Sequence, residues 1–297
     1  MDPTCVLCDR PGPASIGKLA VDVVIDQLER QTGSSLPRSR ERYGHLEVSL
    51  LDCSECHLQF FHPPVVGDAT FYEELAEVSA YYEPLRWDQD VATDLVTPGA
   101  VVIDVGSGSG SFVETAAGAG ARAIGVDFSA GARSIAGADN PTFVQARLED
   151  LRDLDLPRAD IVTAFQVLEH VEDPRGLVGS MAALVVDGGR VVVSVPNRER
   201  FAVDPMQALD CPPHHQTRWG ESQLRRLASE VAMVVESIHV QRVINPARLA
   251  LRMVRRARTT KPADWSLPPA AGARPLTRIV NGTNLVAVFG TSPQTAR

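Results

Sequence analysis

The chain has 297 residues, and 44% of them are hydrophobic, which suits one domain of ordinary size with a smaller module attached. A formal charge of −8 argues against binding along nucleic acid or an anionic membrane surface. There is no 18-residue apolar run and no basic, apolar leader, so we expect a cytoplasmic protein without membrane association.

Four of the five cysteines form two C-x-x-C pairs, which in a reducing compartment indicate a metal site before disulfides. Two thiolates from each tight turn suit tetrahedral Zn²⁺, with Zn–S distances of about 2.3 Å. We expect a structural zinc ion bound by Cys5, Cys8, Cys53 and Cys56. The alternatives are free or redox-active thiols and a catalytic zinc. His57 could replace one thiolate, although its position beside Cys56 is geometrically awkward.

Around these cysteines the sequence predicts three elements. Residues 16–28 have helical spacing, whereas residues 45–51 and 59–64 are typical of strands that enter and leave the second cysteine turn. A connector follows, and residues 88–96 form a helix that Pro98-Gly99 ends. We therefore expect a zinc-ribbon-like module at 1–66, a helical connector at 67–98 and a main domain at 99–297, with an insertion at about 244–282.

From residue 100 onwards, apolar strands alternate with helical segments, which is typical of an α/β fold with a parallel, doubly wound, Rossmann-like sheet. Ligands in such sheets bind outside the carboxyl ends of the strands. The predicted strands are one closing at Ile103 and those at residues 121–127, 142–144, 160–165, 190–195, 233–240 and 284–289.

A glycine loop connects the first of these strands to a helix. It reads Gly106-Ser107-Gly108-Ser109-Gly110, and Asp104 stands just before it. The glycines allow positive φ and let a ligand lie against the main chain, near the N–H groups of the helix. A dinucleotide fold uses G-x-G-x-x-G, and a carboxylate there would repel a pyrophosphate. The same carboxylate attracts a sulfonium and an amino group, so the loop favours S-adenosylmethionine (SAM).

With this loop the chain resembles the class I SAM-dependent methyltransferases. The L-E-H-V run at 168–171 and V-P-N at 195–197 are similar to those of the group that includes the ubiquinone-pathway O-methyltransferases. This resemblance implies a seven-stranded sheet with an antiparallel terminal strand. The N-terminal cysteines resemble the zinc ribbon ahead of some sugar and small-molecule methyltransferases, except that Asp9 and His57 stand where glycine commonly follows the second cysteine.

The resemblance also assigns cofactor contacts. Asp127 lies 21 residues beyond Gly106 and would accept both ribose hydroxyls, although an acid at a helix N-terminus is the alternative. Phe128 would flank the adenine. Arg147 stands where many relatives have an acid for the adenine amino group, so Leu148 is left for packing and Glu149 as a substitute acceptor. Gln166 and Val167 would lie beside the sulfonium, and Phe165 is a further cofactor contact.

On the acceptor side, Glu169 and His170 would form the mouth of the pocket. His214 and His215, in a proline-stiffened loop, would lie over the cofactor, where an imidazole can take a proton from the acceptor. Since adjacent side chains diverge, we expect one of the two to face the pocket, with His215 slightly favoured. His170 could also act as the base, or could only frame the pocket through hydrogen bonds, and one of the pair could instead cap the following helix.

In methyltransferases that this chain resembles, an N-terminal aromatic helix covers the cofactor and substrate. Tyr81 and Tyr82 would form such a lid, or would only pack the domain junction.

The sequence therefore predicts a SAM-dependent methyltransferase that acts on an O, N or C nucleophile of a small molecule, possibly a sugar or secondary metabolite. One alternative is an RNA methyltransferase that uses the ribbon and the basic helix at 246–258. However, residues 1–62 hold six Lys or Arg against nine Asp or Glu, a balance of −3, which disfavours phosphate binding. The other alternative is a non-catalytic SAM-fold protein that binds a protein partner. The oligomeric state stays open.

Overall fold

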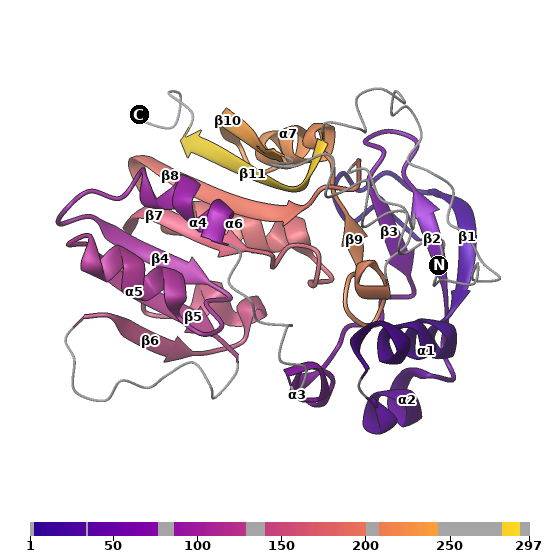
Figure 1. The fold of residues 1–297 in the computed structure, drawn as a ribbon. Coiled ribbons are helices and arrows are strands. Elements are labelled where there is room, and N and C mark those ends of the chain that lie inside the picture. The colour runs from indigo at the N-terminus through magenta and orange to yellow at the C-terminus, as the bar shows by residue number, and fades with distance from the viewer. Residues whose placement is uncertain are drawn as a thin grey trace.

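The computed structural model describes residues 3–33, 35–76, 86–128, 140–199, 208–242 and 281–291. Within these ranges the strands form two sheets that lie side by side, one of seven strands and one of four (Figure 1). Among the helices in these ranges, none combines the length and the apolar character that spanning a membrane requires.

The seven-stranded sheet has the order β10-β11-β8-β7-β4-β5-β6. The central strands pair in parallel, and β11 runs antiparallel to both β8 and β10. All seven predicted strands, including the antiparallel last one, are thereby confirmed. The strands are β4 (Val101–Val105), β5 (Arg122–Asp127), β6 (Thr142–Gln145), β7 (Ala159–Phe165), β8 (Val185–Pro196), β10 (Met233–Arg242) and β11 (Asn281–Thr291).

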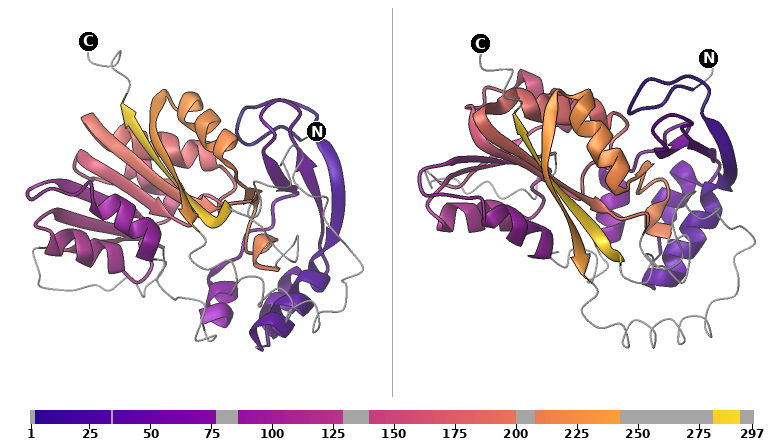
Figure 2. Two further views of the ribbon diagram at one scale, coloured as in Figure 1. Left: turned by 45° about the horizontal axis from the view of Figure 1, so that its top comes forward. Right: turned by 90° about the horizontal axis from the view of Figure 1, so that it is seen from above.

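Helices cover both faces of this sheet (Figure 2). One face packs against α4 (Arg86–Thr93) and α5 (Ser111–Gly118), and the other against α6 (Pro174–Leu184) and α7 (Glu221–Glu230). Successive valines of β8 are buried although their side chains point to opposite faces: Val192 belongs to the first core, and Val191 and Val193 to the second. This double coverage explains why the strands read as continuous apolar runs.

The four-stranded sheet is antiparallel and has the order β1-β2-β3-β9. Three strands come from the N-terminus: β1 (Ala14–Ala20), β2 (Glu47–Asp52) and β3 (Gln59–His62). The fourth, β9 (Thr217–Arg218), follows β8 in the chain and lies at the edge of the small sheet that faces the large one (Figure 1). Residues 1–66 therefore do not build this sheet alone.

The predicted helix at 16–28 is wrong in its first half. Residues up to Ala20 form β1, which pairs with β2, and the helix α1 begins only at Val21 and ends at Thr32. The apolar residues Val21, Val24, Ile25 and Leu28 carry the helical spacing, and all four are buried. The strands predicted at 45–51 and 59–64 are confirmed as β2 and β3.

A third core lies below the small sheet, where α1 packs with α2 (Pro37–Tyr43) and α3 (Ala69–Ala76). The carboxylate of Glu74 in α3 accepts the backbone N–H groups of Arg38 and Ser39, so it caps α2 and fixes the two helices to each other. The fifth cysteine, Cys211, is buried in this core and packs there as a small apolar residue. Two 3-10 helices, η1 (Leu148–Asp153) and η2 (Ala208–Asp210), complete the described elements.

Candidate active site

The glycine loop follows the carboxyl end of β4 and is bonded to the end of β5. The N–H groups of Gly106 and Ser107 both donate to the carbonyl of Val126, at 2.7 and 3.1 Å. Gly106 has φ +74°, and a Cβ on it would lie only 2.6 Å from Cγ2 of Val167. Glycine is therefore required here by backbone conformation and by space.

Carboxylates gather around this loop. Asp127 accepts the N–H of Gly108 at 2.8 Å, and the buried Asp104 accepts the hydroxyl of Thr163 at 2.6 Å. Burial raises the pKa of Asp104 to about 7; the Thr163 hydrogen bond lowers this pKa, and the nearby charges of Asp127 and Asp88 raise it. A cationic ligand beside Asp104 would stabilise its ionised form and offset the cost of burying that charge. The site thus suits the sulfonium and amino groups of SAM and would repel a pyrophosphate.

The glycine loop also presents a polar atom to a ligand. Oγ of Ser107 is buried without a hydrogen-bond partner among the described residues. Buried hydroxyls are normally paired. The orphaned hydroxyl, together with the open backbone at Gly108, where a Cβ would meet nothing within 4 Å, fits a polar ligand that lies across the loop.

At the carboxyl end of β7 the backbone turns sharply. Gln166 has φ +54°, and its backbone N–H and side-chain amide both donate to Oγ of Ser194, at 3.1 and 3.0 Å. Ser194 in turn donates to Asp88 of α4 at 2.7 Å. Phe165, by contrast, packs edge-on against Phe112 of α5, with ring centroids 4.9 Å apart. Gln166 is therefore anchored to Ser194 of β8, whereas Phe165 packs against the core.

The predicted adenine contacts are only partly assembled. Phe128 is 43% exposed, and its ring lies 6.1 Å from that of Tyr72. Leu148 begins η1 and packs against the core. Glu149 is exposed and is hydrogen-bonded to Arg147 at 3.2 Å, so Arg147 already engages the proposed substitute acceptor.

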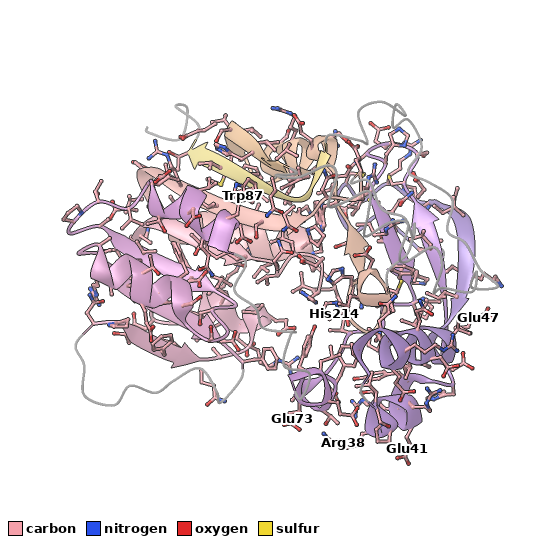
Figure 3. All side chains as sticks on the ribbon, in the orientation of Figure 1. Arg38, Glu41, Glu47, Glu73, Trp87 and His214 are labelled. Atoms are coloured by element: carbon pink, nitrogen blue, oxygen red, sulfur yellow. The ribbon has the colours of Figure 1, made fainter. Side chains whose placement is uncertain are left out.

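The three predicted catalytic histidines form one cluster, although 44 residues separate His170 from His214. Ring centroids are 4.6 Å apart for His170 and His214, 4.8 Å for His170 and His215, and 4.4 Å for the adjacent pair. His214 lies between the large sheet and the α1–α3 group (Figure 3). Tyr72 of α3 contacts this cluster, because its hydroxyl lies 3.0 Å from Nδ1 of His170.

The expectation that His214 and His215 diverge is wrong. Their rings stack with an interplanar angle of 22°, and both side chains are buried. The N–H groups of both residues donate to the carbonyl of Cys211, so the chain forms a tight turn in which neighbouring side chains share one side. Neither histidine caps α7, whose N-cap residue Gly220 makes no side-chain cap.

Glu169 was expected at the mouth of the pocket and is instead buried, with 1% exposure. Neither carboxylate oxygen has a hydrogen-bond partner among the described residues. Burial, together with the charges of Asp88 and Asp210, raises the pKa of Glu169 to about 8. Burial likewise lowers the pKa of His170 to about 3 and that of His214 to about 4. These two imidazoles are therefore neutral at physiological pH.

The four predicted metal-binding cysteines converge at the small sheet. The sulfur atoms of Cys5 and Cys56 are 3.5 Å apart, and those of Cys8 and Cys53 are 3.6 Å apart. The edge of a ZnS₄ tetrahedron with Zn–S bonds of ~2.3 Å is about 3.8 Å. The donor set and spacing therefore fit zinc. His57 is not part of this cluster and faces Asp52 instead, at 3.5 Å.

The two cysteine turns have the same backbone design. In each, the residue after the second cysteine has a left-handed conformation, with φ +56° at Asp9 and +55° at His57. Their N–H groups donate to the carbonyls of Cys5 and Cys53, at 3.0 and 2.9 Å. These are the positions where glycine is common, so the chain adopts the conformation that glycine favours without glycine itself.

Some predicted features lie outside the described residues, namely Tyr81, Tyr82 and the basic helix at 246–258. Four other residues at the site were not predicted: Tyr72, Asp88, Ser194 and Asp210. None of the four was assigned a role: Asp88 and Ser194 lie inside a predicted helix and a predicted strand, and Tyr72 and Asp210 lie outside the predicted helices and strands. Only the position of Ser194 at the carboxyl end of a predicted strand was a signal.

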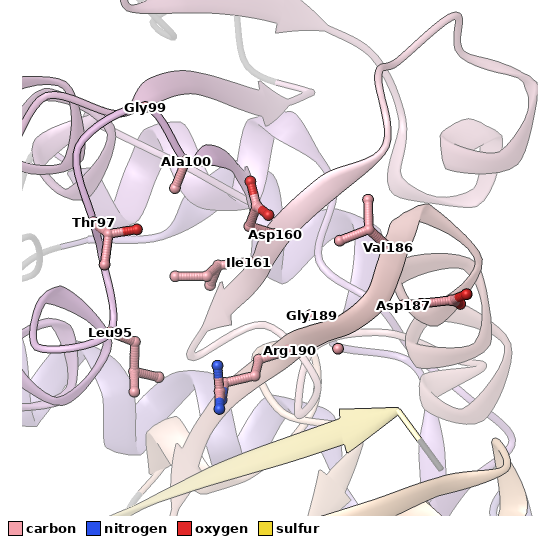
Figure 4. A pocket seen from close by; sticks show the side chains of 11 residues that line it. Leu95, Thr97, Gly99, Ala100, Asp160, Ile161, Val186, Asp187, Gly189 and Arg190 are labelled. Atoms are coloured by element: carbon pink, nitrogen blue, oxygen red, sulfur yellow. The ribbon is translucent and has the colours of Figure 1, made fainter. Parts of the chain in front are cut away.

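A depression of about 360 Å³ lies at the opposite, amino end of the parallel strands (Figure 4). It is lined by the turn before β4, by Asp160 and Ile161 of β7, and by residues 186–190. None of the predicted site residues lines it. In parallel sheets of this kind ligands bind at the carboxyl ends, so this depression is not the candidate active site.

The strand order, the glycine loop and the acidic cradle define the class of the protein as a class I SAM-dependent methyltransferase. A model of the methyltransferase domain family matches residues 81–244, and the chain belongs to this family.

Among curated proteins, the chain is 34% identical over 170 residues to the ubiquinone biosynthesis O-methyltransferase of Alkalilimnicola ehrlichii, covering 52% of this chain and 69% of that one. It is 39% identical over 120 residues to the protein of that name from Bordetella avium, where the match covers 38% of this chain and 49% of the relative. Among solved structures it is similar to a SAM-dependent methyltransferase from Mesorhizobium loti, with 18% identity, a TM-score of 0.47, and coverage of 68% and 97%.

Proposed function

We propose that this methyltransferase methylates a hydroxyl group of a small molecule that binds beside the histidine cluster. The observation that carries the proposal is that three imidazoles and a buried carboxylate gather next to the cofactor strands. Asp88 connects the two parts, since it accepts from Ser194 and raises the pKa of both Asp104 and Glu169. The names of the curated relatives, which are O-methyltransferases, support a hydroxyl acceptor.

The chain's own residues divide into two groups. Asp104, Ser107 and Asp127 would hold SAM, which supplies an already activated methyl group. The remaining task is to place the acceptor oxygen in line with that group and to remove its proton, so proximity and orientation supply most of the acceleration. His170 and His214 are weak bases at neutral pH, because their pKa values lie near 3 and 4. If one histidine acts alone as the base, it is His215.

We also propose a structural zinc ion at Cys5, Cys8, Cys53 and Cys56. Three of the four sulfurs are buried, and they belong to the same core as Trp219 and Leu224. The side chain of Gln223 in α7 donates to the carbonyl of Cys56 at 2.7 Å. The ion would thus fix the small sheet to the methyltransferase domain. Metal analysis of the purified chain and of a Cys53→Ser variant tests this directly.

The test of the acceptor is a methyl-transfer assay with labelled SAM and a panel of hydroxylated small molecules, run beside total RNA. Transfer of label to a small molecule supports the proposal if a His215→Ala variant does not carry it out. Label in RNA, with binding that weakens steeply as salt rises, supports the RNA alternative. Tight binding of S-adenosylhomocysteine (SAH) without transfer to any acceptor supports a non-catalytic SAM-fold protein.

A further inference from the structure

Hydrogen bonds fix the protonation of two histidines in the cluster. Nδ1 of His170 lies 2.7 Å from the carbonyl oxygen of His214, and Nδ1 of His214 lies 2.7 Å from the carbonyl oxygen of Leu209. Because a carbonyl only accepts, each Nδ1 carries the proton and donates it. The lone pair of both rings is therefore on Nε2.

The third ring is arranged in the same way. Nδ1 of His215 faces the carboxylate of Asp210 at 3.7 Å, and its Nε2 lies 4.0 Å from Oε1 of Glu169. Nε2 of His170 lies 3.9 Å from that same oxygen. Each Nδ1 thus faces an acceptor, and two of the Nε2 atoms converge on one carboxylate oxygen. Histidines that bind metals typically donate their other ring N–H to a carbonyl or a carboxylate in this manner.

Glu169 provides an independent indication. A carboxyl group with 1% exposure and no hydrogen-bond partner among the described residues is costly to ionise, because nothing replaces the water it has lost. The nearest nitrogens, Nε2 of His170 and Nε2 of His215, hold lone pairs when Nδ1 is protonated, so neither can donate a hydrogen bond to Glu169. A metal ion between these atoms would satisfy the carboxylate and both imidazoles at once.

We propose that His170, His214 and His215 bind a divalent transition-metal ion through Nε2, with Glu169 as the fourth ligand. One ligand atom from each histidine lies within 4.8 Å of the other two. Neighbouring nitrogens in a tetrahedral zinc site, with Zn–N bonds of ~2.0–2.1 Å, are about 3.3 Å apart. Small side-chain movements close this difference. Three imidazoles with a carboxylate suit Zn²⁺ or a similar ion of intermediate softness.

The place of the ion gives it a role at the acceptor. Tyr72 contacts both His170 and Phe128, so the cluster adjoins the side of the site assigned to the cofactor. A zinc ion with three histidine ligands keeps its fourth position for an exchangeable oxygen ligand and lowers the pKa of a hydroxyl bound there. The acceptor hydroxyl would take that position from Glu169, and the released Glu169 carboxylate would accept the hydroxyl proton. The ion would then hold the acceptor as its alkoxide or phenolate. This acceptor role rests on the proposed function, whereas the binding of the ion does not.

The test is a titration of the metal-free full-length chain with Co²⁺, followed by absorption spectroscopy. Thiolate ligands give intense near-ultraviolet charge-transfer bands, so ions at the cysteines and at the histidines are distinguishable. We expect two equivalents, of which only one shows thiolate bands. His170→Asn and His215→Asn should each lower the stoichiometry from two to one and keep those bands. Cys8→Ser should remove the bands and keep the other equivalent.

His239 provides the matched control. It is exposed on β10 and hydrogen-bonded to Ser237, so His239→Asn should still bind two equivalents. A wild-type chain that binds one equivalent, at the thiolates, overturns the proposal, as does a His170→Asn/His215→Asn double variant that still binds two. The thiolate bands report that each histidine variant is folded. SAH calorimetry on the same samples tests the methyltransferase site separately, so failure of the ion leaves that result intact.

Discussion

The hydroxyl of Tyr72 lies 3.0 Å from Nδ1 of His170, which joins the helix α3 to the turn after β7 across 98 residues of sequence. Tyr72 also contacts His214 and Phe128. It therefore stands between the cofactor side and the histidine cluster, and it fixes the orientation of one ring of that cluster.

Tyr72→Phe keeps the ring contacts and removes this hydrogen bond. A bond of this kind contributes about 1 kcal/mol, so we expect the turnover number to fall roughly fivefold. SAH affinity should stay within twofold, because the ring against Phe128 is retained. Steady-state kinetics and calorimetry measure the two effects. A variant with wild-type turnover would show that the Tyr72 hydroxyl does not orient His170 for the reaction.

Replacing Asp127 should act on the cofactor alone. Its carboxylate accepts the N–H of Gly108 and is assigned to the ribose hydroxyls. Hydrogen bonds to a charged group contribute about 1.5–3 kcal/mol, so Asp127→Ala should weaken SAH binding by roughly 10- to 100-fold in calorimetry. Asp187→Ala, at the opposite end of the sheet, is the matched control and should bind SAH normally. Unchanged affinity in Asp127→Ala would remove this residue from the cofactor site.

His215→Ala should lower turnover without affecting the cofactor. A group that activates an acceptor contributes about 10²- to 10⁴-fold, whether it acts as a base or through a bound ion. We expect a loss in that range, with SAH affinity unchanged. The pair of measurements is decisive, since parallel losses in both would indicate damage to the fold and wild-type rates would exclude His215 from the reaction.

Asp104 should make stability and cofactor binding depend on pH. Its pKa rises from an ordinary 3.8 to about 7 in the folded chain. The folded protein therefore retains a proton that the unfolded chain releases between about pH 4 and 7. The free energy of unfolding without ligand should fall across that window and level off above it.

The side chain that Asp104→Asn introduces cannot ionise, so the variant should lack this pH-dependent fall in the free energy of unfolding, which is on the order of 4 kcal/mol at most. Denaturant unfolding of both proteins at pH 4.5, 6 and 8 measures the difference. Binding of the SAH amino group should also favour ionised Asp104, so about one proton should be released near pH 6. Calorimetry in buffers of different ionisation enthalpy detects that proton, and wild-type binding without proton release would contradict the assignment.

The large sheet could be predicted from sequence because its central strands β4, β7 and β8 are apolar runs buried on both faces. The cofactor loop was predictable for a similar reason, since glycines and one acid lie in a single short stretch. The helix predicted at 16–28 failed at its start because residues 16–20 are held by pairing with β2, a contact between distant segments that local spacing does not encode.

The histidine cluster shows most clearly what could not be predicted from the sequence. The sequence singled out His170, His214 and His215, yet it placed Glu169 at the mouth of the pocket and turned the adjacent histidines apart. Their actual positions depend on a turn at Cys211 and on backbone bonds from Gln216 and Thr217 to Glu169. Tyr72 and Asp88 joined the site through the packing of α3 and α4, which no motif announces.

The strand β9 has a consequence for how such a protein could arise or be rebuilt. Its two residues complete a sheet whose other strands precede the cofactor loop by 40 residues or more in the chain, and they come directly after the histidine turn. A recombination event with one breakpoint would separate the small sheet from its own edge strand. Exchange of this module between methyltransferases therefore needs two coordinated transfers, so acceptor preference and the cysteine module should be inherited together.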